Sequence, residues 1–201
     1  MAVFIIVSFL QEEANIYQFS AVQGYYVSFR EEYYRLFSSM FVHSGMMHIA
    51  MNMLSLYMVG RMVERIFGSL AFLSIYFLSG LFGSFLYMYM NISGSAVGAS
   101  GAIFGIFGAL AGFALVHRER MQNEFVQFMK DFGIILVINF FIGIVFPDIA
   151  MSAHVGGLLA GLIGGMIVAK NPKFLGVYIL FSLIILFAVN SYLLSLYATM
   201  I

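Results

Sequence analysis

The sequence predicts an all-α, polytopic membrane protein. Of its 201 residues, 63% are hydrophobic and 9% are charged, whereas a soluble domain of this length carries about 25% charged residues. The apolar residues gather in runs of about 20, the length that a helix needs to cross the hydrocarbon core of a bilayer. Charged residues separate these runs. The chain therefore belongs in a lipid bilayer, and we expect no separate soluble domain.

Seven apolar runs are expected to form membrane helices. The first is the weakest, because its ten apolar residues are followed by Gln11, Glu12 and Glu13. It is either a short helix or one whose natural beginning is missing from this chain. The predicted spans are 1–19, 42–60, 69–90, 97–116, 131–147, 150–169 and 174–198.

Charged and turn-forming residues mark where the later runs begin and end. Such residues interrupt apolar periodicity and signal the ends of membrane helices. The long segment between the first two spans contains many tyrosines, which suit the interface between water and lipid. In chain order, the boundary residues are Arg61, the segment Asn91 to Ser95, Arg118, Lys130, Pro147, Lys170 and Lys173.

The basic residues also predict how the helices are oriented. Lys and Arg are enriched on the cytoplasmic side of membrane proteins. The spans 42–60, 97–116 and 150–169 should therefore run parallel, from the outer face toward the cytoplasm, and 11–41 should be an outer loop. Of the nine basic residues, only Arg30 and Arg35 do not fit this arrangement. The seven that fit are Arg61, Arg65, Arg118, Arg120, Lys130, Lys170 and Lys173.

Polar side chains from these three spans are expected at one depth. Counted from the outer loops at a rise of about 1.5 Å per residue, Ser100 and His154 both lie roughly 8 Å below the outer helix ends. In the outer half of 42–60, His48 and Asn52 are four residues apart and share a face. Because unpaired polar groups are costly in lipid, these four side chains should face one another or a wetted cavity.

Glycines predict that the helices carrying Ser100 and His154 pack closely. Small residues at four-residue spacing let helix backbones approach each other in membranes. His154 is three residues before the first glycine of its series, and Ser100 directly precedes Gly101, so both lie along the expected contact. The two series are Gly101, Gly105, Gly108 and Gly112 in one helix, and Gly157, Gly161 and Gly165 in the other.

A structural explanation exists for each of these residues alone. A serine beside glycines is common where membrane helices touch, and a single histidine can serve as a hydrogen-bonding link between helices. The functional interpretation rests on the conjunction of Ser100, His154 and a separate histidine and asparagine pair at one level. A hydroxyl within reach of an imidazole can be activated as a nucleophile.

Four ordered motifs make the chain resemble the rhomboid family of intramembrane serine proteases. The resemblance covers roughly residues 30 to 170, and it divides the chain into a six-helix core, 1–170, and an additional C-terminal membrane helix, 171–201. The pair Tyr34-Arg35 resembles an aromatic and arginine pair in the family's first outer loop. The motifs are His43-Ser44-Gly45-Met46-Met47-His48-Ile49-Ala50-Met51-Asn52, then Gly60, Glu64 and Gly68, then Gly98-Ala99-Ser100-Gly101, and Ala153-His154-Val155-Gly156-Gly157 with Gly161.

The resemblance implies roles for specific residues. Ser100 would attack the scissile carbonyl of a transmembrane-helix substrate, and His154 would take its proton and return it to the leaving amine. His48, Asn52 and the backbone N–H of Ser100 would donate to the oxyanion. The protein would lie in the plasma membrane of a prokaryote, with its site open to the external face. His43 would support a water or the outer loop, whereas Arg35 and Glu64 are interpreted as structural.

Two positions depart from the family pattern. The residue four after the nucleophile is usually tyrosine in the family but is Phe104 here, so ring stacking on His154 survives and a phenolic hydrogen bond does not. No carboxylate lies at the depth of His154, since Asp148 is nearly two turns above it. We therefore expect a dyad of serine and histidine rather than a triad that includes an aspartate.

The resemblance also implies a route for the substrate. A transmembrane helix would enter sideways between the spans 42–60 and 131–147, past a displaceable wall of phenylalanines. Simple contact with lipid explains each of these phenylalanines equally well. The expected members of the wall are Phe132, Phe140, Phe141 and Phe146.

Other classes of function remain as alternatives. A catalytically inactive rhomboid-like adaptor would bind transmembrane helices without cleaving them. A metal site could use His43, His48 and His154, but no H-E-x-x-H pattern occurs, and we expect neither a metal nor another cofactor. A channel would need charged or carbonyl-lined rings. The net charge of zero argues against a nucleic-acid partner, so the expected partners are the lipid bilayer and transmembrane substrates.

Overall fold

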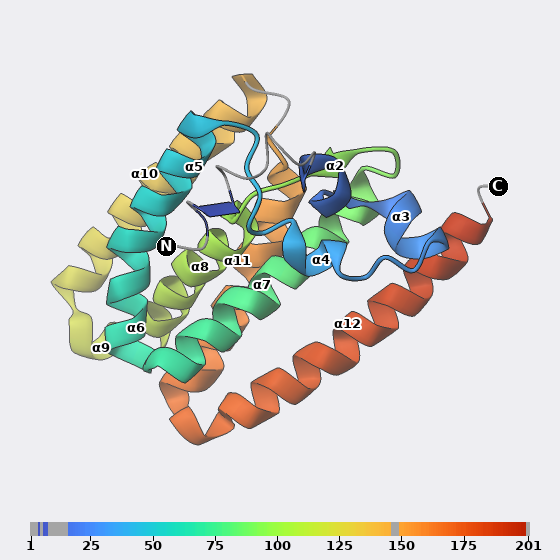
Figure 1. Cartoon of the computed structure of the whole chain (residues 1–201). Coiled ribbons are helices and arrows are strands. Elements are labelled where there is room, and N and C mark those ends of the chain that lie inside the picture. Colours follow the sequence, from blue (N-terminus) through green and yellow to red (C-terminus); the bar gives the residue numbers. More distant parts are fainter. Residues whose placement is uncertain (1–3, 5, 8–15, 146–148, 200–201) are drawn as a thin grey trace.

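The computed structural model describes residues 4, 6–7, 16–145 and 149–199, which form a bundle of helices (Figure 1). The all-α class is confirmed, while the predicted span 1–19 lies largely outside the described residues. The elements are α2 Ile16–Ser20, β1 Val22–Gln23, α3 Gly24–Phe29, α4 Arg35–Ser38, α5 Met46–Ser55, the π-helical turn η1 Leu56–Gly60, α6 Arg61–Phe67, α7 Ser69–Met90, β2 Ser95–Ala96, α8 Ser100–Val116, α9 Arg118–Met121, α10 Asn123–Val145, α11 Met151–Lys170, the 3-10 turn η2 Pro172–Phe174 and α12 Leu175–Ala198.

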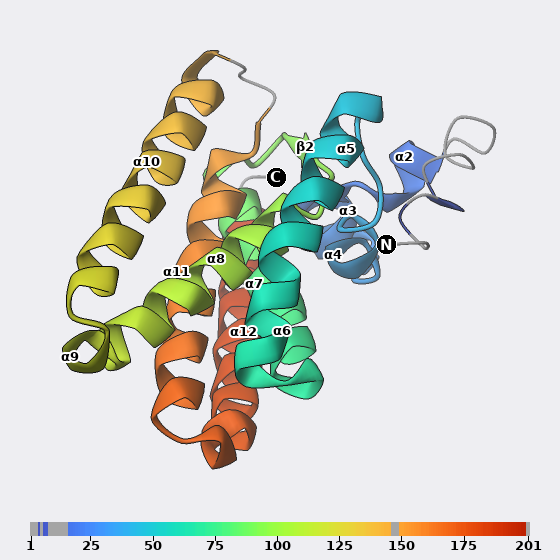
Figure 2. The same cartoon turned by 90° about the vertical axis from the view of Figure 1, so that its left-hand side faces the viewer.

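Three helices in the described part of the chain are long and apolar enough to cross a membrane. They are Ser69–Met90, Met151–Lys170 and Pro172–Ala198, while the apolar helix Ser100–Val116 is shorter. The first of these has the predicted bounds, and the other two differ from prediction by one or two residues. Figure 2 shows α5, α8 and α11 descending in the same direction, while α7, α10 and α12 return.

The ends of the other predicted spans differ from the structure. The predicted span 42–60 is wrong at both ends, because a continuous helical run extends from Met46 through η1 to Phe67. Similarly, α10 begins at Asn123, before Lys130. Arg, Lys and Glu have high helix propensity, so a helix can continue through them beyond the apolar run. They therefore mark the edge of the bilayer more reliably than the end of a helix.

The start of α8 is the difference that matters most for the site. The predicted span began at residue 97, but the helix begins at Ser100. Gly98 has φ of +124°, a left-handed conformation that glycine adopts readily and other residues avoid. This turn brings an extended strand directly into the helix, so Ser100 is the first helical residue.

The predicted glycine contact between α8 and α11 is confirmed. A Cβ atom on Gly157 would collide with the carbonyl oxygen of Gly101, and one on Gly161 would collide with that of Gly105. Gly165 lies in the same way against the carbonyl of Ala109. Successive turns of the two backbones therefore touch directly, and no side chain separates them.

The segment before α5 forms a cap at one end of the bundle. A short ladder pairs β1 with β2, with Val22 opposite Ala96 and Gln23 opposite Ser95. The sequence patterns did not predict this ladder, because two-residue strands have no detectable alternation. The ladder fixes the chain that leads into Gly98, whose N–H also donates to the carbonyl of Ser39 at 2.8 Å.

Arg35 holds this cap together. Its guanidinium donates to the carboxylate of Glu32 at 2.6 Å, to the carbonyl of Gln18 at 2.7 Å and to that of Ala21 at 3.2 Å. It also lies 4.3 Å from the ring centroid of Tyr26. The hydrogen bond from Arg35 lowers the pKa of Glu32 below its usual value. The contacts agree with the structural interpretation of Arg35.

Candidate active site

Ser100 and His154 meet between α8 and α11. His154 is the fourth residue of α11, and its Nε2 lies 2.8 Å from the Oγ of Ser100. The imidazole is buried, with 7% of its surface exposed, while Ser100 is partly exposed. The glycine contact described above places the two backbones close enough for these short side chains to touch. This distance is the one a base needs to accept a hydroxyl proton.

Phe104 fixes the orientation of the histidine. Its ring lies one turn below Ser100 on α8 and stacks on the imidazole of His154, with centroids 4.3 Å apart and an angle of 10° between the planes. Stacked ring pairs add about 0.5–1.5 kcal/mol beyond the area they bury. The predicted stacking is confirmed, and it holds the imidazole edge toward the hydroxyl.

No described carboxylate bonds to the second nitrogen of the imidazole. Within the described residues, the buried Nδ1 of His154 has no hydrogen-bond partner. Asp148, the nearest acidic residue in the sequence, lies outside the described residues. The described residues therefore form a serine and histidine pair.

His48 faces the same loop from α5. The N–H of Ser44 donates to its Nδ1 at 3.4 Å, and the hydroxyl of Ser44 lies 2.9 Å from the same nitrogen. A Cβ atom on Gly98 would lie 2.8 Å from the Nε2 of His48 and 3.8 Å from the Oγ of Ser100. Gly98 therefore separates the two side chains, and any larger residue would push against the imidazole.

Asn52 and His43 occupy positions that support the site. The buried side chain of Asn52 donates through Nδ2 to the backbone carbonyl of His48 at 2.9 Å. His43 is fully buried, and its Nε2 accepts from the N–H of Ala99 at 3.5 Å. The residue before Ser100 is thus tied to His43, a link between distant segments that the motif spacing alone did not reveal.

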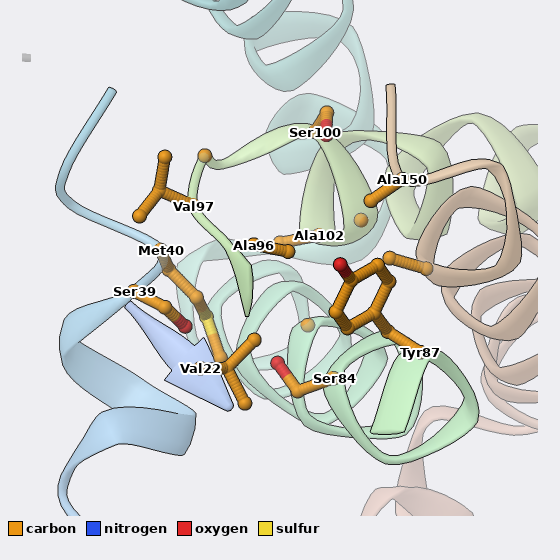
Figure 3. A pocket seen from close by; sticks show the side chains of 14 residues that line it. Val22, Ser39, Met40, Ser84, Tyr87, Ala96, Val97, Ser100, Ala102 and Ala150 are labelled. Atoms are coloured by element: carbon orange, nitrogen blue, oxygen red, sulfur yellow. The ribbon is translucent and has the colours of Figure 1, made fainter. Parts of the chain in front are cut away.

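A small cavity lies beside Ser100 (Figure 3). Its volume is about 20 Å³, which is enough for roughly one water molecule. Polar lining comes from Ser39, Ser84, Tyr87 and Ser100, and the hydrophobic lining includes Met40. The hydroxyl of Tyr87 donates to the carbonyl of Ser95 at 3.0 Å, which fixes one wall.

The phenylalanines of the expected wall are only partly described. Phe132 is buried and stacks on Phe128, with ring centroids 5.9 Å apart, whereas 61% of Phe141 is exposed. The side chain of Phe140 and the whole of Phe146 lie outside the described residues. Figure 2 shows α10 standing apart from the rest of the bundle.

The described residues do not gather metal ligands. Within this part of the chain, no group of three or more histidine, aspartate or glutamate side chains is placed to hold a metal ion. The histidines of the site instead contact serine, phenylalanine and backbone groups. This arrangement suits acid and base chemistry on a hydroxyl.

Comparison with known proteins places this arrangement in a family. The family model of the Rhomboid domain matches residues 30–171. RHOMBOID-like protein 1 of Arabidopsis thaliana is 35% identical over 145 residues, which cover 72% of this chain and 37% of that protein. Rhomboid protease GluP of Bacillus subtilis (strain 168) is 40% identical over 134 residues, covering 65% of this chain and 25% of that protein.

A third relative is named as inactive. Inactive RHOMBOID-like protein 8 of Arabidopsis thaliana is 33% identical over 129 residues, which cover 64% of this chain and 36% of that protein. The chain thus spans less than half the length of these curated relatives. Since they come from a plant and a bacterium, they do not support the expected prokaryotic plasma membrane over other membranes. The chain is an integral, multi-pass membrane protein, and it belongs to the rhomboid family.

Proposed function

We propose that this protein is an intramembrane serine protease that cleaves a peptide bond in or near the transmembrane helix of a membrane-protein substrate. The observation that carries the proposal is the 2.8 Å contact between Ser100 Oγ and His154 Nε2. The relative GluP, whose name describes it as a rhomboid protease, supports it. Residues 1–170 would form the protease core and 171–201 an additional helix.

The proposed reaction has two halves. The hydroxyl of Ser100 gives its proton to His154 Nε2 while its oxygen bonds to the scissile carbonyl carbon. The resulting tetrahedral intermediate collapses, the imidazolium gives the proton to the leaving amine, and the carbon to nitrogen bond breaks. A water then attacks the acyl-enzyme while His154 takes its proton. The ester bond to Ser100 breaks, His154 returns the proton to Ser100 Oγ, and the carboxylic acid product leaves the regenerated enzyme.

The tautomer of His48 supports its role in holding the oxyanion. Its Nδ1 accepts from the backbone N–H of Ser44, so in the neutral ring the proton resides on Nε2. That nitrogen lies next to Gly98, on the side of the loop where Ser100 follows. His48 would therefore donate through Nε2 to a negative oxygen bound beside Ser100.

Two further donors complete the proposed oxyanion hole. The N–H of Ser100 lies in the first turn of α8, where backbone amides have no acceptor within the helix. Asn52 uses its amide nitrogen to reach the carbonyl of His48, but this nitrogen carries two hydrogens and one stays available. Removing one such donor typically lowers the rate by about 100- to 1,000-fold.

The substrate would enter between α5 and α10. The outward face of α5 carries exposed methionines, including Met47 with 75% of its surface exposed. Flexible methionine side chains adapt to partners of varied shape. Because α10 stands apart from the bundle, as Figure 2 shows, it is the helix that can move to admit a substrate.

The site would open toward the external face. Helix α9, which contains Arg118 and Arg120, and the turn from α11 into α12, which contains Lys170 and Lys173, lie at one end of the bundle. Helix α8, whose first residue is Ser100, begins toward the opposite end (Figure 2). The excess of basic residues favours the cytoplasm for the first end. The particular membrane, for which the sequence suggests the plasma membrane of a prokaryote, stays a prediction.

A non-catalytic function is the second candidate. The similarity to a relative named inactive favours a protein that binds transmembrane helices without cleaving them. Such an adaptor would have no use for a hydroxyl in contact with an oriented imidazole. Cleavage distinguishes the two candidates directly.

The test is cleavage of a single-span membrane protein in liposomes. We expect the wild type to cleave, and Ser100→Ala and His154→Ala to lose at least about 1,000-fold in rate, because each removes one half of the reacting pair. Ser191→Ala is the matched control, since this exposed serine on α12 bonds to the carbonyl of Phe187 in its own helix. Equal cleavage by wild type and Ser100→Ala would refute the proposal, and no cleavage by the folded wild type would favour the adaptor.

A further inference from the structure

A long apolar groove lies between α7, α11 and α12, away from Ser100. Its volume is about 540 Å³, within the range of about 300–1,000 Å³ that is typical of ligand sites. Figure 1 shows α12 at the edge of the bundle opposite α10. The walls are mostly aliphatic and aromatic and include Phe85 of α7, Ile163 and Ile167 of α11, and Phe181 and Ile185 of α12.

The groove persists because α12 is fastened at both of its ends. At the outer end, the hydroxyl of Tyr197 donates to the carbonyls of Met88 at 3.0 Å and Ile92 at 3.4 Å. Toward the cytoplasmic end, the hydroxyl of Tyr178 donates to the carbonyl of Ala160 at 3.4 Å. These bonds fix the position of α12 beside α7 and α11 at two points. The space between them is lined almost entirely by apolar side chains, which suits hydrocarbon rather than water.

The size of the groove favours an acyl chain over a helix. Its α12 wall runs from Val177 to Leu193, which at about 1.5 Å per residue is roughly 24 Å, most of the about 30 Å hydrocarbon core. A helix with side chains is about 10–12 Å across. A helix of this length would need far more space than the groove offers, whereas an extended acyl chain is thin enough.

Charge at the cytoplasmic mouth indicates which lipid fits. Ile163, Ile167 and Lys170 follow one another at spacings of four and three residues, so Lys170 continues the α11 wall of the groove. Lys173 lies in η2, at the bend that leads into α12, and both lysines are exposed. In the described part of the chain, neither forms an ion pair. Two cations beside an apolar groove complement a phosphate attached to an acyl chain.

The outer mouth has a different chemistry. Tyr89 of α7 and Tyr192 of α12 lie there with ring centroids 6.5 Å apart. Tyrosine suits the interface between water and lipid, but it supplies no charge. Among the described residues, the outer lining of the groove contains no cation, so the two lysines make the cytoplasmic end the better match for an anionic headgroup.

We propose that this groove binds one acyl chain of an anionic phospholipid from the cytoplasmic leaflet, with Lys170 and Lys173 holding its phosphate. The site is separate from Ser100 and does not depend on the proposed protease activity. It gives the last helix a defined lipid partner within the fold.

Tryptophan fluorescence provides the test, because the chain contains no tryptophan. The variant Phe181→Trp places the fluorophore in the groove, and Leu180→Trp places it on the adjacent residue outside the groove. The replaced side chains are 60% and 58% exposed and lie at nearly the same depth. Each variant of the full chain is reconstituted in phosphatidylcholine vesicles that contain dibrominated phosphatidylglycerol or dibrominated phosphatidylcholine as a quencher.

We expect Phe181→Trp to be half-quenched at a several-fold lower fraction of dibrominated phosphatidylglycerol than of dibrominated phosphatidylcholine. Leu180→Trp should show no difference between the two lipids. Adding Lys170→Gln and Lys173→Gln to Phe181→Trp should abolish the preference. Adding Arg118→Gln and Arg120→Gln, which removes the same charge from α9, should leave the preference intact.

Two results would overturn the proposal. Equal quenching of Phe181→Trp by both lipids would show that the groove does not prefer an anionic phospholipid. An unchanged preference after both lysines are replaced would show that they do not hold its phosphate. If Phe181→Trp does not fold, the adjacent pair Ile185→Trp and Ile184→Trp makes the same comparison, since only Ile185 lines the groove. Cross-links between two copies across the groove would identify a protein occupant instead and would likewise overturn the proposal.

Discussion

The helix pair α8 and α11 and the helix α12 show two opposite ways of packing in one bundle. Between α8 and α11, Gly157 and Gly161 lie directly on the carbonyls of Gly101 and Gly105. By contrast, α12 is held by hydroxyl groups near its ends and leaves a groove of about 540 Å³ between them. The close contact carries Ser100 and His154, and the open contact carries no residue of the candidate site.

This difference follows from what drives helices together in lipid. Apolar side chains gain little by leaving lipid for one another, so association depends on close packing and hydrogen bonds. Between α8 and α11, the glycine series gives close backbone packing over successive turns. Tyr178 and Tyr197 of α12 instead give hydrogen bonds, which hold this helix only near its two ends. Close packing is therefore concentrated where two side chains must keep a fixed distance.

The largest expected effect comes from filling the close contact. In Gly161→Val, the new side chain would collide with the backbone of Gly105, and overpacking of this kind costs about 3 kcal/mol. We expect the unfolding free energy to fall by that amount and cleavage of a single-span substrate to be lost. Both are measured in detergent micelles, by denaturant titration and by gel assay.

The control for this variant is another helical glycine. A Cβ on Gly176 would meet no atom within 4 Å, so Gly176→Ala should stabilise the protein by up to about 1 kcal/mol through helix propensity. If Gly161→Val and Gly176→Ala unfold at the same denaturant concentration, the contrast between the two packing modes is wrong.

The next effect sharpens the comparison at the end of the close contact where Ser100 lies. In Gly98→Ala, a Cβ would lie within 2.8 Å of the His48 ring at a residue with φ of +124°. We expect cleavage to fall about 100-fold, the loss typical of a displaced oxyanion donor, and stability to fall by about 1–3 kcal/mol. Initial cleavage rates under conditions where the variant is fully folded measure the first effect.

Gly68→Ala separates strain from contact with the site. Gly68 also has a positive φ, +81°, but no atom lies within 4 Å of its Cβ position. This variant should lose similar stability and keep its cleavage rate. A rate as low as that of Gly98→Ala would show that backbone strain alone explains both.

The smallest effect tests the open contact. Tyr197→Phe removes the hydroxyl that bonds to the carbonyls of Met88 and Ile92, which should cost about 1 kcal/mol and leave cleavage unchanged. Tyr192→Phe, at a ring that is 56% exposed, should change stability by less than about 0.5 kcal/mol. Loss of cleavage in Tyr197→Phe would mean that α12 contributes to the site after all.

Features that depend on a regular sequence pattern could be predicted from the sequence. Apolar runs predicted α7, α11 and α12 to within a few residues, and the four-residue glycine spacing predicted that α8 and α11 touch. The meeting of Ser100 and His154 followed from these two signals together. Each depends on regular geometry that one helix imposes on its own residues.

Features formed by distant segments could not be predicted in this way. Three such features are the ladder between β1 and β2, the hydrogen bond from Ala99 to His43, and the close approach of His48 to Gly98. Each joins segments that no common sequence periodicity relates. The groove beside α12 depends on where Tyr178 and Tyr197 find acceptors. These contacts are decided by tertiary packing, which local patterns do not encode.

The glycine contact has a consequence for how such a protein can evolve. Because any side chain at Gly157 or Gly161 would collide with the backbone of α8, no rotamer can accommodate a larger residue there. These positions therefore cannot accept substitutions without moving the two helices apart. The exposed face of α12 tolerates exchange among apolar side chains, since lipid adapts to any of them. Lineages can therefore diversify the exposed face of the last helix while inheriting Ser100 and His154 in one unchanged geometry.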